Sequence, residues 1–110
     1  MTTAQRRPAA HECGLDAAMG VIEGKWKVSI LWALGEGACR FGRLRRMLPG
    51  ITEKVLASHL RELERDGMVT REEFAETVPK VEYSLTGPGI ALNRALEPLG
   101  DWGKRHLLGG

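Results

Sequence analysis

Residues 41–67 constrain the fold more than any other part of this 110-residue chain. Phe41, Leu44 and Leu48 are spaced i, i+3 and i+7, so they share one face of a helix. The Pro49-Gly50 dipeptide then interrupts the pattern, because proline and glycine favour turns. The stretch therefore predicts a short amphipathic helix that ends in a tight turn.

A second helix follows this turn directly. Thr52 stands at the N-cap position, where its side-chain oxygen can accept a hydrogen bond from a free backbone N–H of the first turn. Leu56, Leu60 and Leu63 share one face of the helix, and Gly67 is placed to end it in the left-handed conformation. A helix, a short turn with glycine and a second helix form a helix-turn-helix arrangement.

The other face of the second helix carries a different set of side chains. At about 100° per residue, Lys54, Ser58, Arg61 and Arg65 lie opposite the leucines, and three of the four are positively charged. A helix with one buried face and one face of this kind is suited to the major groove of DNA. A solvated surface helix shows the same pattern, so this face alone does not decide between the two interpretations.

The positive charge of the chain is local. The formal net charge is only +2, but residues 37–52 contain four arginines and no acidic residue. Residues 53–76 contain seven acidic residues against four basic ones. A clustered basic segment is the pattern expected of a nucleic-acid-binding surface. The arginines of this segment are Arg40, Arg43, Arg45 and Arg46.

Length and composition limit the class of protein. A chain of 110 residues predicts one domain, which we place at residues 13–108, with residues 1–12 as a flexible N-terminal arm. The two cysteines, Cys13 and Cys39, are too far apart in sequence for a zinc or thioredoxin-type motif. The sequence shows no signal peptide and no membrane-spanning run. We therefore expect a cytoplasmic protein without metal, cofactor or membrane partner.

The segments before the helix-turn-helix predict two further helices. Residues 15–23 form the first, and residues 25–34 form a second that is apolar nearly all round. Such a helix is buried in the core or in a subunit interface. Residues 38–40 are placed to add a short edge strand.

The segments after Gly67 predict a hairpin and a last helix. Residues 68–74 and 80–85 read as two strands, because Val81, Tyr83 and Leu85 alternate with polar residues. A hairpin directly after a helix-turn-helix is the wing of a winged helix. Thr86 caps the last helix, and we expect a kink or a break at Pro98, which removes a backbone hydrogen bond.

With these elements in place, the chain resembles the HxlR-type winged-helix transcriptional regulators of bacteria, a MarR-like group. The resemblance covers about residues 13–102, and its motifs occur in the order of the family. The combination is far more specific than any single motif. The matching residues are Cys13, Gly24-Lys25-Trp26, Arg40-Phe41-Gly42, Leu44-Arg45, Leu48-Pro49-Gly50-Ile51, Leu60-Arg61-Glu62-Leu63-Glu64, Asp66-Gly67 and Val81-Glu82-Tyr83-Ser84-Leu85-Thr86.

The resemblance implies an α+β, mostly helical fold: a winged helix-turn-helix with extra N- and C-terminal helices that form a homodimer. It also implies a regulator that binds double-stranded DNA at a palindromic operator, with the helix after Thr52 as recognition helix. Ala57 and Ser58 stand where larger polar residues are common in the family, so the operator sequence stays open. The expected DNA-binding residues are Arg43, Arg45, Arg46, Thr52, Lys54, Ser58, Arg61 and Lys80.

Regulation and rival functions stay open at this point. Cys13 lies where several members of the family carry a redox- or electrophile-sensing cysteine. The alternative is that Cys13 is buried and packs as a small apolar residue. Cys39 reads as a core or strand residue, and a Cys13–Cys39 disulfide remains an alternative. The tryptophans read as core residues, although a cavity at the dimer interface near Trp26, Trp32 and Trp102 could take a small-molecule effector. There are two rival functions. One is a winged helix that binds only protein, and the other is a thiol enzyme, which needs a base beside its cysteine, and none is evident beside Cys13 or Cys39.

Overall fold

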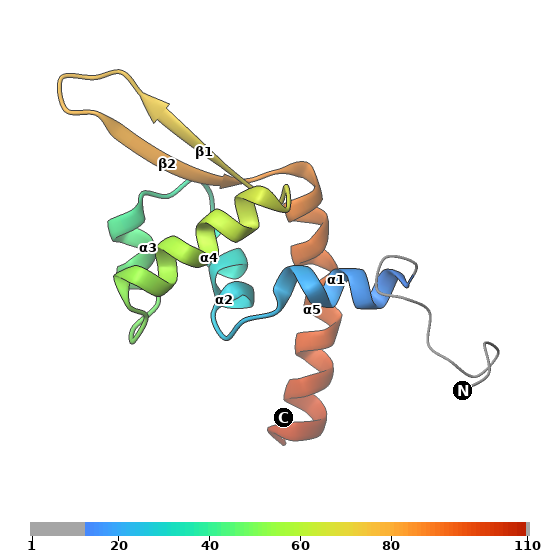
Figure 1. Cartoon of the computed structure of the whole chain (residues 1–110). Helices are drawn as coiled ribbons and strands as arrows, with labels where there is room; N and C mark the ends of the chain where they lie inside the picture. The colour runs from blue at the N-terminus through green and yellow to red at the C-terminus, as the bar shows by residue number, and fades with distance from the viewer. Residues whose placement is uncertain (1–12, 110) are drawn as a thin grey trace.

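The computed structural model describes residues 13–109, and the predicted arm at residues 1–12 lies outside the described residues. Five helices and one hairpin confirm the predicted α+β winged helix-turn-helix (Figure 1). In chain order the elements are α1 Gly14–Ile22, α2 Lys27–Leu34, α3 Phe41–Met47, α4 Glu53–Arg65, β1 Val69–Phe74, β2 Lys80–Leu85 and α5 Gly87–Leu107.

The core lies between α2, α3 and α4. On α4 the three leucines of the predicted apolar face, Leu56, Leu60 and Leu63, are at most 1% exposed. Leu44 of α3 and Leu31 of α2 are fully buried against the same cluster. Burial of each such side chain stabilises the fold by about 1.5–3 kcal/mol. The helix-turn-helix is therefore held rigidly on α2.

Both ends of α4 are fixed as the sequence predicts. The Oγ1 atom of Thr52 accepts a hydrogen bond of 3.1 Å from the backbone N–H of Val55. At the other end Gly67 has a φ of 82°, and the N–H of Met68 donates to the carbonyl of Leu63 at 2.9 Å. This is the Schellman type of helix end, which needs a residue without a Cβ at the left-handed position.

The wing is an antiparallel hairpin in which Val69 pairs with Leu85 and Phe74 with Lys80. The five residues 75–79 form its loop. On the other side of β2, Cys39 and Tyr83 exchange two backbone hydrogen bonds of 2.9 and 2.8 Å. The predicted edge strand at residues 38–40 is thus a single-residue bridge, which ties the start of α3 to the base of the wing.

The last helix is continuous, so of the two outcomes expected at Pro98 the break is wrong. Helix α5 runs from Gly87 to Leu107 without a break at Pro98. Pro98 leaves the carbonyl of Arg94 without its N–H partner, but both residues are exposed and water can replace that hydrogen bond. No helix in residues 13–109 is long and apolar enough to cross a lipid bilayer.

Helix α2 is buried on one side only. It begins at Lys27 rather than at Lys25, because residues 24–26 form a turn in which Gly24 has a φ of 125°. Val28 and Trp32 are exposed, Trp32 to 63%. Lys27, in contrast, is only 4% exposed and forms an ion pair with Glu62 of α4. Burial of the whole helix in the core of one chain is therefore wrong, and the alternative, burial of its exposed side in a subunit interface, stays a prediction.

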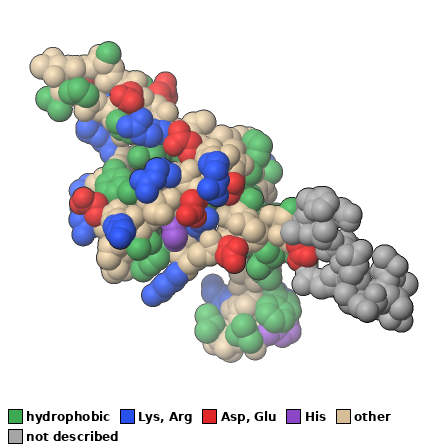
Figure 2. All heavy atoms as spheres, viewed as in Figure 1, with side chains coloured by type: hydrophobic (Ala, Val, Ile, Leu, Met, Phe, Trp, Pro, Cys, Tyr) green, Lys and Arg blue, Asp and Glu red, His purple; other side chains and the backbone are tan. Residues whose placement is uncertain are grey.

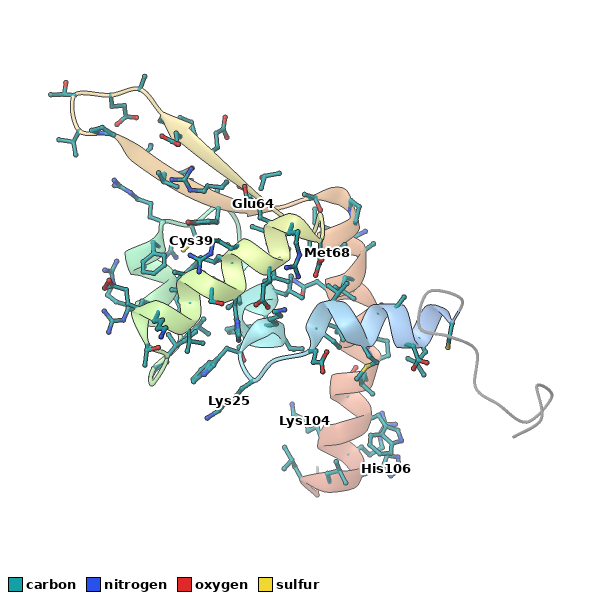
Figure 3. The ribbon with its side chains drawn as sticks, viewed as in Figure 1. Lys25, Cys39, Glu64, Met68, Lys104 and His106 are labelled. Carbon is teal, nitrogen blue, oxygen red and sulfur yellow. The ribbon has the colours of Figure 1, made fainter. Side chains whose placement is uncertain are left out.

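A compact joint connects the end of α4 to the start of α5. The N–H of Thr86 donates to the carbonyl of Met68 at 3.0 Å, and its hydroxyl donates to the carbonyl of Gly67 at 2.6 Å. The same hydroxyl accepts the N–H of Gly89 at 3.0 Å, which caps α5 as predicted. Figure 3 shows Met68 where α4, the wing and α5 meet. Helix α5 then extends away from the helical core (Figure 1).

Candidate nucleic-acid interface

The outward face of α4 carries the predicted recognition residues. Lys54 and Arg61 are exposed, and neither forms an ion pair with another residue in the described part of the chain. Ser58, one turn from each, is half-buried between them. Thr52 lies at the start of the same face, but its hydroxyl oxygen already accepts the capping hydrogen bond. Figure 2 shows several Lys and Arg side chains gathered over the α3–α4 face, with acidic side chains among them.

The arginines of α3 do not act as one group. Arg45 points towards the start of α4, where it lies 3.5 Å from Glu53. Arg43 and Arg46 line a hollow between α3 and β2 instead. Both are exposed, and neither forms an ion pair within residues 13–109. Their charge is available to an outside anion, whereas that of Arg45 is partly satisfied.

The wing satisfies most of its own positive charge. Lys80 lies 3.5 Å from Glu76 and 3.7 Å from Glu82, and its ammonium group is 4.8 Å from the ring centre of Phe74. On β1, Arg71 forms an ion pair of 2.9 Å with Glu73. The hydrogen bond to Glu73 and, as a smaller contribution, the interaction with the Tyr83 side chain raise the pKa of the Arg71 guanidinium. Lys80 is therefore a weaker candidate for a DNA contact than Lys54 or Arg61.

The two cysteines are both free thiols in different surroundings. Cys13 is half-buried at the N-cap position of α1, and its side chain makes no capping hydrogen bond. Cys39 is buried in the core, as expected. Burial raises the pKa of the Cys39 thiol, and the nearby Arg43 charge and the backbone N–H of Arg40 oppose this change. No group of three or more His, Cys, Asp and Glu side chains in residues 13–109 is placed to hold a metal ion.

The three tryptophans do not line one common groove between α2 and α5 in the single chain. Trp26 is half-buried against the core, whereas Trp32 and Trp102 are 63% and 51% exposed, so the core interpretation is wrong for these two. A groove of about 730 Å³ lies between α2 and α5, and of the three tryptophans only Trp32 lines it. Trp102 lies further along α5, 5.3 Å from the ring of His106.

The link between α2 and α4 was not predicted from the sequence. Lys27 donates to Glu62, and this hydrogen bond and the charge of Lys27 lower the pKa of the Glu62 carboxyl. His59, half-buried as expected, lies one turn before Glu62, and its buried Nδ1 atom has no hydrogen-bond partner among residues 13–109. Lysines are rarely buried without a partner, but a sequence does not show which acid supplies it. The pair therefore links α4 to α2.

Comparison with known proteins agrees with this geometry. The pattern of the HxlR-like helix-turn-helix family matches residues 21–109. The regulatory protein MalR of Fusobacterium mortiferum is 42% identical over 101 residues, which cover 91% of this chain and 95% of MalR.

Solved structures show the same fold. A transcriptional regulator of the MarR family from Enterococcus faecalis V583 superposes with a TM-score of 0.80 at 43% identity, covering 94% of this chain and 93% of that one. The redox regulator HypR in its reduced form gives a TM-score of 0.80 at 39% identity, covering 88% and 98% of the two chains. The chain belongs to the HxlR-like helix-turn-helix family and is a transcriptional regulator, not an enzyme.

Proposed function

We propose that this regulator binds a palindromic DNA operator as a homodimer and reads the sequence with the outward face of α4. The division of α4 into two faces is the observation that carries the proposal. Its leucines are at most 1% exposed, while Lys54 and Arg61 extend into solvent without an ion pair in the described chain. A buried inner face holds the helix rigidly, and unpaired Lys and Arg groups suit the guanine acceptors of the major groove.

The other predicted residues take supporting roles in this proposal. Arg43, Arg45 and Arg46 contact phosphates beside the groove, and Thr52 and Ser58 contribute short polar groups close to the DNA. Lys80 contacts the backbone from the wing only if it leaves Glu76 and Glu82, which lie 3.5 and 3.7 Å away. We therefore expect Lys80 to contribute least among the eight residues.

Exposed apolar side chains on α1 and α5 support the homodimer. Leu15 and Met19 of α1 are 68% and 50% exposed, and Leu99 and Trp102 of α5 are similarly uncovered. Figure 2 shows hydrophobic side chains grouped at the lower end of α5. Apolar surface of this kind marks a protein–protein interface. A two-fold dimer would place its two α4 helices about 34–36 Å apart, one turn of DNA.

Cys13 is the proposed redox-sensing residue. It is a free, partly accessible thiol at the start of α1, and α1 belongs to the proposed dimer interface. HypR, which has this fold, is a redox regulator solved in reduced and oxidised forms. Oxidation of Cys13 would therefore act on the dimer rather than on α4. In the Cys13→Ser variant a mild oxidant should leave DNA binding unchanged, and equal loss of binding in both proteins would remove Cys13 from the mechanism.

DNA binding is tested by fluorescence anisotropy with duplexes from the region upstream of the gene and with shuffled duplexes of equal composition. Binding should favour the upstream sequence and should weaken steeply with salt, because Lys and Arg displace counterions from phosphates. Lys54→Ala and Arg61→Ala should each cost about 1–3 kcal/mol of specific binding if they contact base edges. Arg105→Ala, on the last turn of α5, is the matched control. Equal affinity for both duplexes at every salt concentration would instead favour a winged helix that binds only protein.

A further inference from the structure

The hollow between α3 and β2 brings together three arginines that lie outside the proposed recognition helix α4. It has a volume of about 420 Å³ and opens beside the bridge that joins Cys39 to Tyr83. Arg40 stands at the N-cap of α3, and Arg43 and Arg46 follow at intervals of three residues along one side of the helix. Figure 3 shows Cys39 beside this junction of α3 and the wing.

The local sequence keeps the hollow open. Gly42 lies on its wall, and a Cβ atom there would stand 3.6 Å from Nη1 of Arg46. The guanidinium of Arg46 therefore lies over Gly42, one turn back along α3. On the other side, the two backbone hydrogen bonds between Cys39 and Tyr83 hold β2 in place. Both walls are thus set by backbone structure.

The charge in this hollow is not balanced by the residues that the structure describes. Arg40, Arg43 and Arg46 are all exposed, and none of them forms an ion pair in residues 13–109. Arg45 on the same helix, in contrast, has Glu53 at 3.5 Å. The one acidic residue that lines the hollow, Glu82, lies 3.7 Å from Lys80 and so has a cation of its own.

The chemistry of three guanidinium groups limits the ligand. Each group offers N–H donors in a planar fork that matches two oxygens of a phosphate, and such charge-assisted hydrogen bonds are among the strongest in proteins. An apolar molecule would leave these donors unused, and a cation would be repelled. A tetrahedral dianion or a phosphodiester offers oxygens to more than one arginine at once.

We propose that the hollow between α3 and β2 binds one phosphate group, held by Arg40, Arg43 and Arg46. Two sources supply this chemistry. One is a backbone phosphate of DNA, which rests on the proposed DNA-binding function. The other is a free phosphate-bearing molecule, which does not. In either case the occupied hollow would join α3 to the base of the wing and cover the route to the Cys39 thiol.

The test is a titration of the full-length, ¹⁵N-labelled protein with inorganic phosphate, with chloride added in parallel to match ionic strength. The amide signals of Cys39, Gly42 and Arg43 should shift and saturate with phosphate in the wild type. Arg43→Gln and Arg46→Gln should each weaken this binding several-fold, whereas Arg105→Gln should not change it. Shifts no larger than those with chloride, or equal shifts in wild type and both hollow variants, would overturn the proposal.

A second titration, with the upstream duplex, separates the two sources. If the ligand is the DNA backbone, the same signals shift, and each hollow variant lowers the slope of log Kobs against log salt by about 1. An unchanged slope together with intact phosphate binding assigns the hollow to a free phosphate-bearing molecule. Phosphate binding without any DNA sequence preference would refute the proposed function and leave the hollow site standing. Sequence-specific DNA binding without phosphate binding would refute the hollow site and leave the proposed function standing.

Discussion

The joint between α4 and α5 permits a sharp prediction at Gly89. A Cβ atom at this position would lie 2.1 Å from the carbonyl oxygen of Met68, while ordinary contacts of this kind begin at 3.4 Å. Gly89→Ala must therefore move α5 and Met68 apart by roughly 1.3 Å, the difference between those two distances. The hydrogen bond from Thr86 to the same carbonyl is already 3.0 Å long, so this movement would break it.

The expected loss of stability combines overpacking, a lost hydrogen bond and a change in helix propensity. Overpacking costs about 1–3 kcal/mol, and loss of one backbone hydrogen bond costs about 1 kcal/mol. The better helix propensity of alanine offsets up to about 1 kcal/mol of this loss. We expect Gly89→Ala to lower the free energy of unfolding by about 2 kcal/mol in urea denaturation. All proteins are compared at one concentration, because the stability of a dimer depends on concentration.

Gly42→Ala is the matched control for this prediction. Gly42 is exposed in α3, and its Cβ would touch only the flexible end of Arg46, at 3.6 Å. The same substitution should there stabilise the protein by up to about 1 kcal/mol. Opposite signs at the two glycines would support the close approach at the joint. A Gly89→Ala protein as stable as the wild type would refute it.

Two other local structures give predictions of known sign. Because Lys27 lowers the pKa of Glu62, this pair stabilises the fold above about pH 4.5, the ordinary value for Glu, and the contribution is lost as pH falls through the lowered pKa. The urea midpoint of the wild type should thus fall more steeply below pH 4.5 than that of Lys27→Met, and parallel curves would contradict the assignment. Glu62→Gln should be more damaging at pH 7 than Lys27→Met, since it leaves a buried ammonium group unpaired. Thr52→Ala should cost about 1 kcal/mol in urea denaturation by removing the cap of α4, and Thr52→Ser should restore it.

Local sequence patterns were sufficient to predict the second helix of the helix-turn-helix. Thr52 and Gly67 mark the two ends of α4 through backbone chemistry that depends on neighbouring residues only. The i, i+4 and i+7 spacing of Leu56, Leu60 and Leu63 fixes the buried face in the same way. The outward position of Lys54 and Arg61 follows from that face by geometry.

Features that depend on distant residues were not predictable in the same way. The partners of Lys27 and Arg45 both come from α4, and sequence spacing does not show which charges will meet. Helix α2 was expected to be buried in the core or in a subunit interface, because it is apolar nearly all round. Such a pattern does not show which side of the helix faces solvent in a single chain. At Pro98 the expected break is absent, since the carbonyl that loses its N–H partner belongs to an exposed residue.

The central claim is that the outward face of α4 reads DNA, and the most direct measurement is selection of bound duplexes from a randomised pool. The wild type should enrich an inverted repeat with half-sites one helical turn apart, about 10–10.5 base pairs. Lys54→Ala and Arg61→Ala should relax the preference at symmetric positions of that repeat, while Arg105→Ala should select the wild-type sequence. Enrichment of no sequence, or of the same sequence with the same strength by both α4 variants, would contradict the claim.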